Sequence, residues 1–254
     1  NESLVDIPQA KHDYYEMENI LPELGFRDVD ANILNPSYDD IVELRQSIFN
    51  KFKDKNTPLE IIFYYSGHAL TYNNVNYIIP VNARIDFQDD FELKANLISL
   101  DSIRNTFQQI SSLENIIFIL DSCRTNLKGD FAMTKNIEKE KSEGNIFPTN
   151  FLLKDISQGL SSQSPMKNEL IVYSTSPGSV SVADKKDYNS MFTKHLINWI
   201  YTNPNKDIET ILKNVRNSVT IETNNKQIPW TSSTLTKPFF FPRKNPVRYN
   251  VNVY

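Results

Sequence analysis

The chain has 254 residues, of which 23% are charged, and its formal net charge is −4. This length suits one large α/β domain or two small ones, and the even spread of charge argues against a nucleic-acid binder held by a basic patch. One cysteine cannot form an intramolecular disulfide, and three histidines leave little for a metal site, so we expect no bound metal. No apolar stretch approaches the ~20 residues of a membrane span, and the start is no signal peptide. These features predict a soluble, cytoplasmic protein that works without nucleic acid or membrane.

Apolar runs typical of buried strands alternate with segments of helical periodicity, which is the pattern of a layered α/β sheet. The first helix is expected over residues 11–24, with Gly25 at its end and a kink at Pro22. Ser37 and Asp40 form a capping box, with Asp in place of the usual Glu or Gln, at the start of a second helix. The further elements are expected in this order: strands 59–65 and 77–81, a helix from Asp101, strands 115–121 and 169–174, helices over 190–202 and after Asp207, and, beyond residues 227–230, a strand-like segment at 239–241.

Two segments depart from this pattern. Residues 124–168 are rich in Lys, Glu, Ser, Asn and Gly and have few branched apolar side chains, which predicts a long mobile loop. We interpret residues 243–254 as a tail or linker that follows a domain over residues 1–242.

Cys123 and His68 each follow an apolar run that is typical of a buried strand. Because chemistry collects at the carboxyl ends of the strands in an open parallel sheet, we expect the thiol and the imidazole at the same sheet edge. There the imidazole would be placed to take the proton of the thiol, and the thiolate is a nucleophile. A small buried core cysteine and a structural loop histidine stay open as alternatives. We expect His12 and His195 to be ordinary surface or helix-face residues.

Five segments resemble, in the same order, those of the caspase-like cysteine peptidases: FYYSGH at 63–68, LDSCR at 120–124, LIVYSTSPG at 170–178, SMFT at 190–193 and QIPW at 227–230. The likeness is strongest to the prokaryotic caspase homologues, with metacaspases and paracaspases as neighbours, and it covers nearly the whole chain. The 55 residues from His68 to Cys123 are also close to the roughly 50 found in caspases. The resemblance implies a three-layer α/β sandwich, in which a mostly parallel central sheet has helices on both faces.

The resemblance also implies an endopeptidase that acts through a Cys123–His68 dyad, forming an acyl-thioester and then hydrolysing it without a cofactor. The backbone amides of Ala69 and Cys123 would bind the oxyanion. The family usually has Gly at the position of Ala69, and because Ala resists a positive φ, we expect a less well-formed oxyanion hole. Pairing with the substrate backbone would fall to Ser174, Thr175 and Ser176.

The resemblance also bears on specificity. Caspases that cut after Asp have Gln two residues before the Cys, whereas this chain has Asp121. Metacaspases and paracaspases, which it resembles here, use an acid at this position to hold Arg or Lys, and the second acid of their pocket falls on Asp13. Two carboxylates that converge on a guanidinium would give charge-assisted recognition, with Asp184 and Asp187 as weaker candidates for a third acid. The alternatives are a helix N-cap for Asp13 and a solvated strand-end acid for Asp121.

In that family the linker that corresponds to residues 124–168 is often cleaved during maturation. A protease that prefers basic residues would find many targets there, so we hypothesise self-processing. A lysine-rich solvated loop with no such role is an equal alternative. The lysines concerned are Lys128, Lys135, Lys139, Lys141, Lys154 and Lys167.

The sheet of that family begins with an apolar strand that would end about where this chain opens, at Asn1. Because a central strand is costly to omit, we expect this chain to be one domain of a larger protein, with further domains or a regulatory partner. Proteins or peptides with Arg or Lys at the cleavage site are the expected substrates. Two rival functions stay open: a catalytically weak interaction module, which Ala69 allows, and a related thiol peptidase of different specificity, such as one that prefers Asn.

Overall fold

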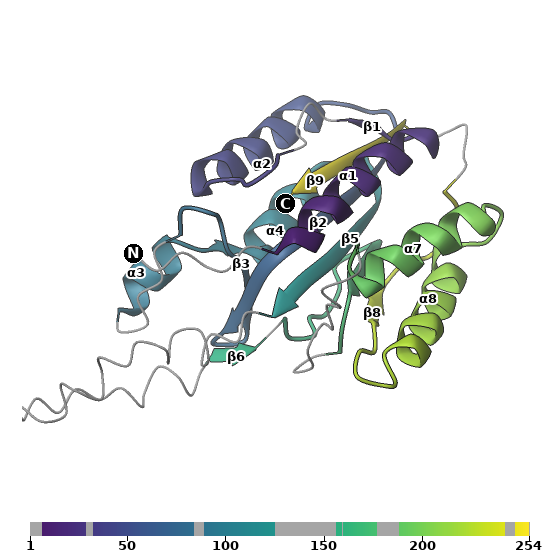
Figure 1. The fold of residues 1–254 in the computed structure, drawn as a ribbon. Helices are drawn as coiled ribbons and strands as arrows, with labels where there is room; N and C mark the ends of the chain where they lie inside the picture. Colours follow the sequence, from purple (N-terminus) through teal and green to yellow (C-terminus); the bar gives the residue numbers. More distant parts are fainter. Residues whose placement is uncertain are drawn as a thin grey trace, which may run out of the picture.

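The structure is a computed structural model that describes residues 7–28, 33–83, 89–124, 156–158, 160–176, 188–241 and 247–253. These residues form a nine-stranded sheet with helices on both of its faces (Figure 1). The strands are β1 (Arg27–Asp28), β2 (Leu59–Tyr72), β3 (Val75–Ile78), β4 (Ile98–Ser99), β5 (Leu113–Arg124), β6 (Ile156–Gln158), β7 (Glu169–Tyr173), β8 (Trp230–Ser233) and β9 (Val247–Val253). The helices are α1 (Pro8–Glu23), α2 (Tyr38–Phe52), α3 (Asp90–Ala95), α4 (Leu100–Gln108), α7 (Met191–Thr202) and α8 (Ile208–Glu222).

The sheet is mostly parallel, and its main strands follow the order β1-β9-β2-β5-β7-β8. The first five of these strands run parallel to one another, and β8 runs antiparallel to β7. β3 and β6 both pair antiparallel with the C-terminal part of β2. This arrangement confirms the expected three-layer α/β sandwich with a mostly parallel central sheet.

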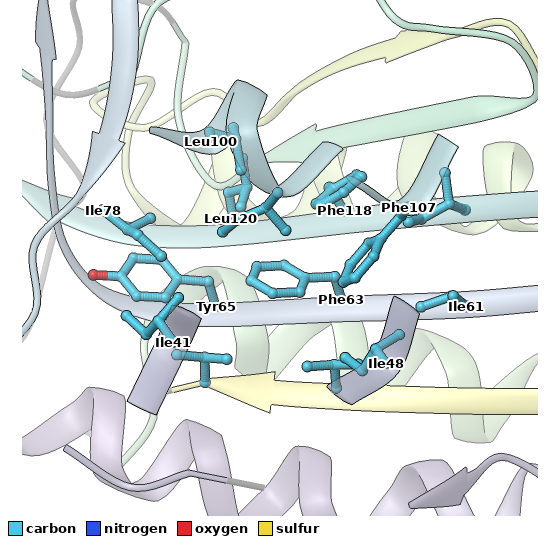
Figure 2. Close-up of a cluster of buried hydrophobic side chains, with 14 of the residues drawn as sticks. Ile41, Ile48, Ile61, Phe63, Tyr65, Ile78, Leu100, Phe107, Phe118 and Leu120 are labelled. Atoms are coloured by element: carbon cyan, nitrogen blue, oxygen red, sulfur yellow. The ribbon is translucent and has the colours of Figure 1, made fainter. Parts of the chain in front are cut away.

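The alternation of side chains along the central strands divides the core between the two faces of the sheet. Phe63 and Tyr65 of β2 lie on the face covered by α2 and α4, where Figure 2 shows them with Phe107 and Phe118. Tyr64 lies on the opposite face, in the cluster formed with α1, α7 and α8. Both faces of the central strands are buried, which is why these strands read as continuous apolar runs in the sequence.

Polar caps begin three of the predicted helices, and two of these caps, Ser37 and Asp207, were themselves predicted. Ser37 Oγ accepts the N–H of Asp40 at 3.2 Å, and the Asp40 carboxylate accepts the N–H of Ser37 at 2.8 Å, which completes the capping box before α2. Ser190 before α7 and Asp207 before α8 each accept a backbone N–H three residues further on. These contacts satisfy donors that the first turn of a helix leaves without partners.

β2 and β5 both extend beyond the predicted strands. β2 continues to Tyr72, where Asn73 and Asn74 turn the chain into β3. Both asparagines have positive φ angles, 47° and 60°, as a two-residue type I′ hairpin turn requires. His68 and Cys123 therefore lie within strands rather than in loops that follow them.

Val247–Val253 forms a strand, so the expectation of a tail or linker over residues 243–254 is wrong for this part of the chain. β9 lies between β1 and β2 and is parallel to both, pairing with β2 from Leu59 to Tyr65 (Figure 1). Val251 is completely buried. Without β9, the facing edges of β1 and β2 would leave backbone groups unpaired. The C-terminal strand thus fills a central place in the sheet.

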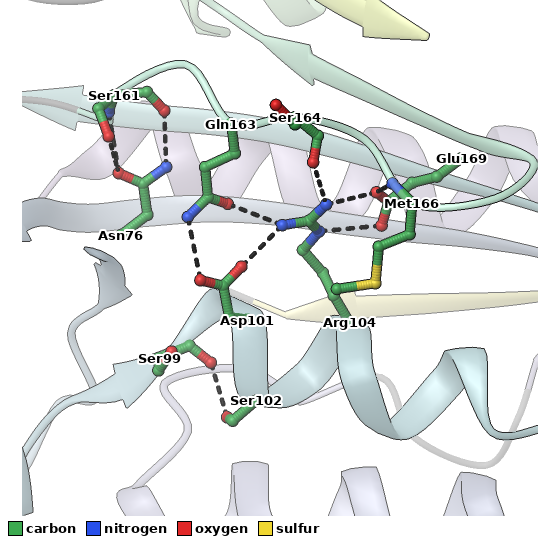
Figure 3. Close-up of polar contacts among 10 residues, drawn as sticks. All are labelled: Asn76, Ser99, Asp101, Ser102, Arg104, Ser161, Gln163, Ser164, Met166 and Glu169. Carbon is green, nitrogen blue, oxygen red and sulfur yellow. Dashed lines mark hydrogen bonds and ion pairs between the residues drawn. The ribbon is translucent and has the colours of Figure 1, made fainter. Parts of the chain in front are cut away.

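Residues 160–168 and β6 are attached to the body of the protein, which corrects the expectation of a mobile loop for this part of 124–168. β6 pairs with β2. The Ser161 N–H donates to Asn76 Oδ1 at 2.9 Å, and Asn76 Nδ2 donates to the Ser161 carbonyl at 2.7 Å (Figure 3). Residues 125–155 of the expected loop lie outside the described residues.

A buried ion pair holds the same segment between α4 and β7. Arg104 Nε and Nη2 donate to the two carboxylate oxygens of Glu169 at 2.9 and 2.5 Å. The guanidinium also donates to the side chains of Asp101 and Gln163 and to the carbonyl of Ser164 (Figure 3). Because a buried charge is tolerated only when it is paired and hydrogen-bonded, this network ties the chain before β7 to helix α4.

Candidate active site

The register between β2 and β5 sets the backbone positions of the expected nucleophile and base. From Glu60 to Ala69 the two parallel strands pair residue by residue without interruption. In this register His68 lies opposite Cys123, and neighbouring strands of a sheet are about 4.8 Å apart. The backbone therefore brings these two residues to adjacent positions, while their catalytic roles stay a prediction.

Gly67 allows the ring of Tyr65 to approach the strand beside His68. A Cβ atom at residue 67 would lie 2.8 Å from Tyr65 Oη and 3.0 Å from Tyr65 Cζ. The Tyr65 hydroxyl donates to the His68 carbonyl at 2.5 Å, and the same carbonyl accepts the N–H of Ile79 at 3.0 Å. The backbone of His68 is thus held by two donors, and only glycine at residue 67 leaves room for the tyrosine.

Ala69, the expected second donor to the oxyanion, lies in β2 beyond His68. Its backbone pairs with Ile78 of β3 and with Arg124 of β5. The left-handed conformation that alanine resists is not adopted here, since the residues with positive φ lie elsewhere in the described chain. Resistance of alanine to a positive φ is therefore no reason to expect a poorly formed oxyanion hole in this conformation. The role of the Ala69 amide stays a prediction.

Asp13 of α1 and Asp121 of β5 meet at the N-terminus of α7. Both side chains are completely buried, at 0% exposure. α1 begins at Pro8, so Asp13 lies inside the helix and the alternative role of a helix N-cap is wrong. The burial of Asp121 likewise contradicts the alternative of a solvated acid at the end of a strand.

Ser190, the N-cap of α7, contacts both carboxylates. Its backbone N–H donates to Asp13 Oδ1 at 3.0 Å, and its hydroxyl donates to Asp121 Oδ2. The Thr193 hydroxyl donates to the same Asp121 oxygen at 2.7 Å, and the Asn189 amide donates to Asp13 Oδ1 at 3.0 Å. The positive end of the helix dipole lies at this terminus and favours negative charge. One helix end therefore supports both acids.

Each of the two carboxylates keeps one oxygen without a hydrogen bond. No donor among the described residues reaches Asp13 Oδ2 or Asp121 Oδ1, although both atoms are buried. Burial raises the pKa of Asp13 well above its usual range, and the charge of Asp121 raises it further. Burial also raises the pKa of Asp121, against the hydrogen bonds from Ser190 and Thr193 and the nearby Ser174 hydroxyl, which lower it. Two buried carboxylates with free oxygens favour either a shared proton or a bound cation.

The segment after β7, which we expect to pair with the substrate backbone, lies against the segment before β8. The Ser174 N–H donates to the Leu120 carbonyl at 3.0 Å, and the Ser174 carbonyl accepts Gln227 Nε2 at 2.8 Å. The Ser176 hydroxyl donates to the Ile228 carbonyl at 2.8 Å. Two of the segments that carry the resemblance thus contact each other, while substrate pairing stays a prediction.

The other two histidines lie on helices, His12 on α1 and His195 on α7. Asp184 and Asp187, the weaker pocket candidates, lie outside the described residues. The His12 ring packs edge-on against Tyr188 with their centroids 4.7 Å apart. His195 Nε2 lies 2.6 Å from the carboxylate of Glu222, on the face that α7 presents to α8.

Sequence reasoning did not assign any role in the site to Ser190, Thr193 or Tyr64. The Tyr64 hydroxyl lies 2.8 Å from the Thr193 hydroxyl, next to Asp121. Ser190 and Thr193 were recognised only as part of a segment that resembles the family. A serine before an apolar helical run signals a helix start, and this signal could have indicated polar groups near the acids.

Within the described ranges, no three or more His, Cys, Asp or Glu side chains are grouped as a metal site requires. The same residues include no helix that is both long and apolar enough to cross a membrane.

Comparison with known proteins identifies the family to which this fold and site belong. No curated protein matches the chain. The model of the caspase domain family matches residues 3–240, a range that includes His68, Cys123 and both buried acids. The match also covers all the described helices and all the described strands except β9. The chain therefore belongs to the caspase family of cysteine peptidases.

Proposed function

We propose that the protein is an endopeptidase that cleaves after Arg or Lys, with Cys123 as the nucleophile and His68 as the base. The observation that carries the proposal is the buried pair of acids, Asp13 and Asp121, each with a free carboxylate oxygen. Asp121 stands two residues before Cys123 in β5, a span of about 7 Å along a strand. A cationic side chain bound by the acids would therefore bring its own carbonyl group close to residue 123.

A basic side chain suits the negative charge of this acid pair better than an Asn or Asp side chain does. A guanidinium offers five donors in a planar fork that suits carboxylates, and an ammonium offers three. Either cation would supply donors to Asp13 Oδ2 and Asp121 Oδ1 and would offset the repulsion between the two charges. An Asn side chain carries no charge, and an Asp side chain would add a third negative group. The pair thus favours Arg or Lys.

The proposed reaction proceeds in two halves. His68 takes the thiol proton of Cys123, and the thiolate forms a C–S bond with the carbonyl carbon of the scissile peptide. The C–N bond then breaks as the imidazolium gives its proton to the leaving amine, which leaves an acyl-thioester. A water molecule next loses a proton to His68 and attacks the thioester. The C–S bond breaks, and the thiol regains its proton as the carboxylic acid leaves.

Peptide reporters that end in Arg, Lys, Asp or Asn test this proposal, with Cys123→Ala and Asp121→Asn as variants. We expect the wild type to cleave the Arg and Lys reporters and both variants to lose this activity. Cleavage of only the Asp or Asn reporters would support peptidase activity but contradict a pocket for Arg or Lys. A wild type that cleaves none of the four would favour the interaction module instead.

We also infer that the enzyme cleaves its own chain between residues 124 and 168. Five lysines lie between residues 128 and 154, and they match the proposed specificity. The chain beyond them is attached to the body through β6 and through the contacts of Ser161 and Arg104. Both fragments would therefore stay together after cleavage. On a denaturing gel we expect two fragments from the wild type and an intact Cys123→Ala chain, and an intact wild type after long incubation would contradict self-processing.

A further inference from the structure

A row of hydroxyl groups extends from Asp121 into the core of the protein. Asp121 Oδ2 accepts the Thr193 hydroxyl at 2.7 Å, and the Thr193 hydroxyl oxygen lies 2.8 Å from that of Tyr64. Thr193 lies on α7 and Tyr64 on β2, and both side chains have 0% exposure. The row therefore connects three elements, β5, α7 and β2, at a place that is closed to solvent.

The chemistry of an ionised carboxylate decides the direction of each hydrogen bond in this row. A carboxylate can only accept, so Thr193 donates its single hydroxyl proton to Asp121 and accepts that of Tyr64. Ser190 is constrained in the same way, because its hydroxyl donates to Asp121 while its oxygen accepts the N–H of Thr193 at 3.0 Å. The Ser190 and Thr193 hydroxyls both donate to Oδ2, whereas the buried Oδ1 accepts no hydrogen bond from the described residues.

We propose that Thr193, supported by Tyr64, is a positioning residue that orients Asp121 so that its free Oδ1 meets the cationic side chain of the substrate. This inference rests on the proposed function, since it assigns Thr193 a part in the recognition of Arg or Lys. Two hydroxyl groups on one oxygen fix the rotation of the carboxylate about its Cβ–Cγ bond. Thr193 is branched at Cβ and lies in a helix, so its own side chain is restricted in rotation as well.

The row also favours the ionised form of Asp121 against the effect of its burial. Hydrogen bonds to the charged form of a carboxylate favour that form, and the bond from Thr193 lowers the pKa of Asp121 against the effect of burial. Burial and the charges of Asp13 and Asp121 raise the pKa of Tyr64 well above its usual range, so its hydroxyl stays protonated and can donate. A donor behind Thr193 polarises the Thr193 hydroxyl and strengthens its bond to Asp121.

Three variants test this inference: Thr193→Val removes the hydroxyl at nearly constant shape, Thr193→Ser keeps it, and Tyr64→Phe removes only the supporting group. We expect Thr193→Val to lower kcat/KM on Arg and Lys reporters by about 10- to 100-fold, the effect of losing a hydrogen bond to a charged group, mainly through KM. The acidic limb of its pH profile should move to higher pH, because Asp121 becomes harder to ionise. Thr193→Ser should stay close to the wild type, and Tyr64→Phe should fall between the two.

The rate at which iodoacetamide alkylates Cys123 serves as a control, because it depends on the thiol and not on the acid pair. We expect this rate to be equal in all four proteins. A Thr193→Val protein with wild-type kcat/KM and pH profile would overturn this inference but not the proposed function. Equal losses of kcat/KM in Thr193→Val and Thr193→Ser would do the same. If Thr193→Val does not fold, a Tyr64→Phe protein with unchanged KM and pH profile would overturn the inference instead. A wild type without preference for Arg or Lys would overturn the proposed function and this inference together.

Discussion

Gly67 stands at a crowded point of the strand that carries His68. Its missing side chain makes room for the Tyr65 ring, whose hydroxyl holds the His68 carbonyl. The apolar run before it indicated a strand, but nothing local in the sequence indicated that a ring would cross this position.

We predict that Gly67→Ala lowers kcat/KM by about 100-fold, since a shift of about 1 Å at a catalytic group has an effect of this size. The new Cβ would lie 2.8 Å from Tyr65 Oη, so either the ring or the strand must move. Steady-state kinetics on a cleaved reporter measures the loss. The double variant Gly67→Ala/Tyr65→Phe should regain part of the activity, because the nearest clashing atom is gone. Unchanged activity in the single variant would show that the ring can yield without disturbing His68.

The burial of Asp13 predicts a pH-dependent stability. Its pKa is raised in the folded protein, so the folded state prefers the protonated acid, and this contribution is lost as the pH rises from about 4, the ordinary value for Asp, through the raised pKa. We therefore expect Asp13→Asn to be more stable than the wild type at pH 7, by about 1 kcal/mol, and nearly equal to it at pH 4. Chemical denaturation at the two pH values measures the difference. The same gap at both pH values would mean that the charge of Asp13 is not responsible.

At the scale of elements, the buried pair of Arg104 and Glu169 joins α4 to β7 and to the chain before it. Burial lowers the pKa of Arg104, but Glu169 and Asp101 outweigh this effect and raise it, so the guanidinium stays charged. Asp101 was expected to begin the helix, whereas α4 begins at Leu100 and Asp101 accepts from Arg104. The helix itself was predictable from its periodicity, but its ion pair with β7 was not, because the partner lies 65 residues further along.

We predict that Glu169→Gln lowers the free energy of unfolding by about 3–5 kcal/mol, because it leaves the charge of Arg104 buried without its counterion. A matched control is Lys194→Gln, which breaks the exposed pair between Lys194 and Glu222 and should change stability by less than about 1 kcal/mol. Urea unfolding of both variants provides the comparison. Similar effects in the two would indicate that the buried pair adds no more than a surface one.

At the scale of the whole molecule, β9 makes the sheet continuous from β1 to β8. We predict that deleting residues 243–254 lowers the free energy of unfolding by more than about 4 kcal/mol, because β1 and β2 would face each other with unpaired edges. Deleting Tyr254 alone, which lies beyond β9, should have little effect. A synthetic peptide of residues 243–254 should restore the melting temperature of the truncated protein. A truncated protein with the stability of the full chain would show that β9 is dispensable.

The sequence by itself determined the elements that depend on local pattern. Apolar runs and helical periodicity predicted the central strands and most of the helices, and the cap at Ser37 lies where a capping box was expected. The same signals predicted His68 and Cys123 at one edge of the sheet, because parallel strands collect their carboxyl ends there, and the pairing of β2 with β5 then made the two residues neighbours. These signals are readable because each one arises from neighbours in the chain.

The tertiary structure alone decided what depends on distant partners. We interpreted β9 as part of a tail, although its apolar residues alternate with Arg248, Asn250 and Asn252 as in a half-buried strand. Only the gap between β1 and β2 makes this segment a buried strand. The support of Asp121 by Thr193 joins residues 72 positions apart. Local pattern shows that a strand or a helix start exists, but the choice of its partner is made by the packing of the whole sheet, where unpaired backbone groups and buried charges must find their contacts.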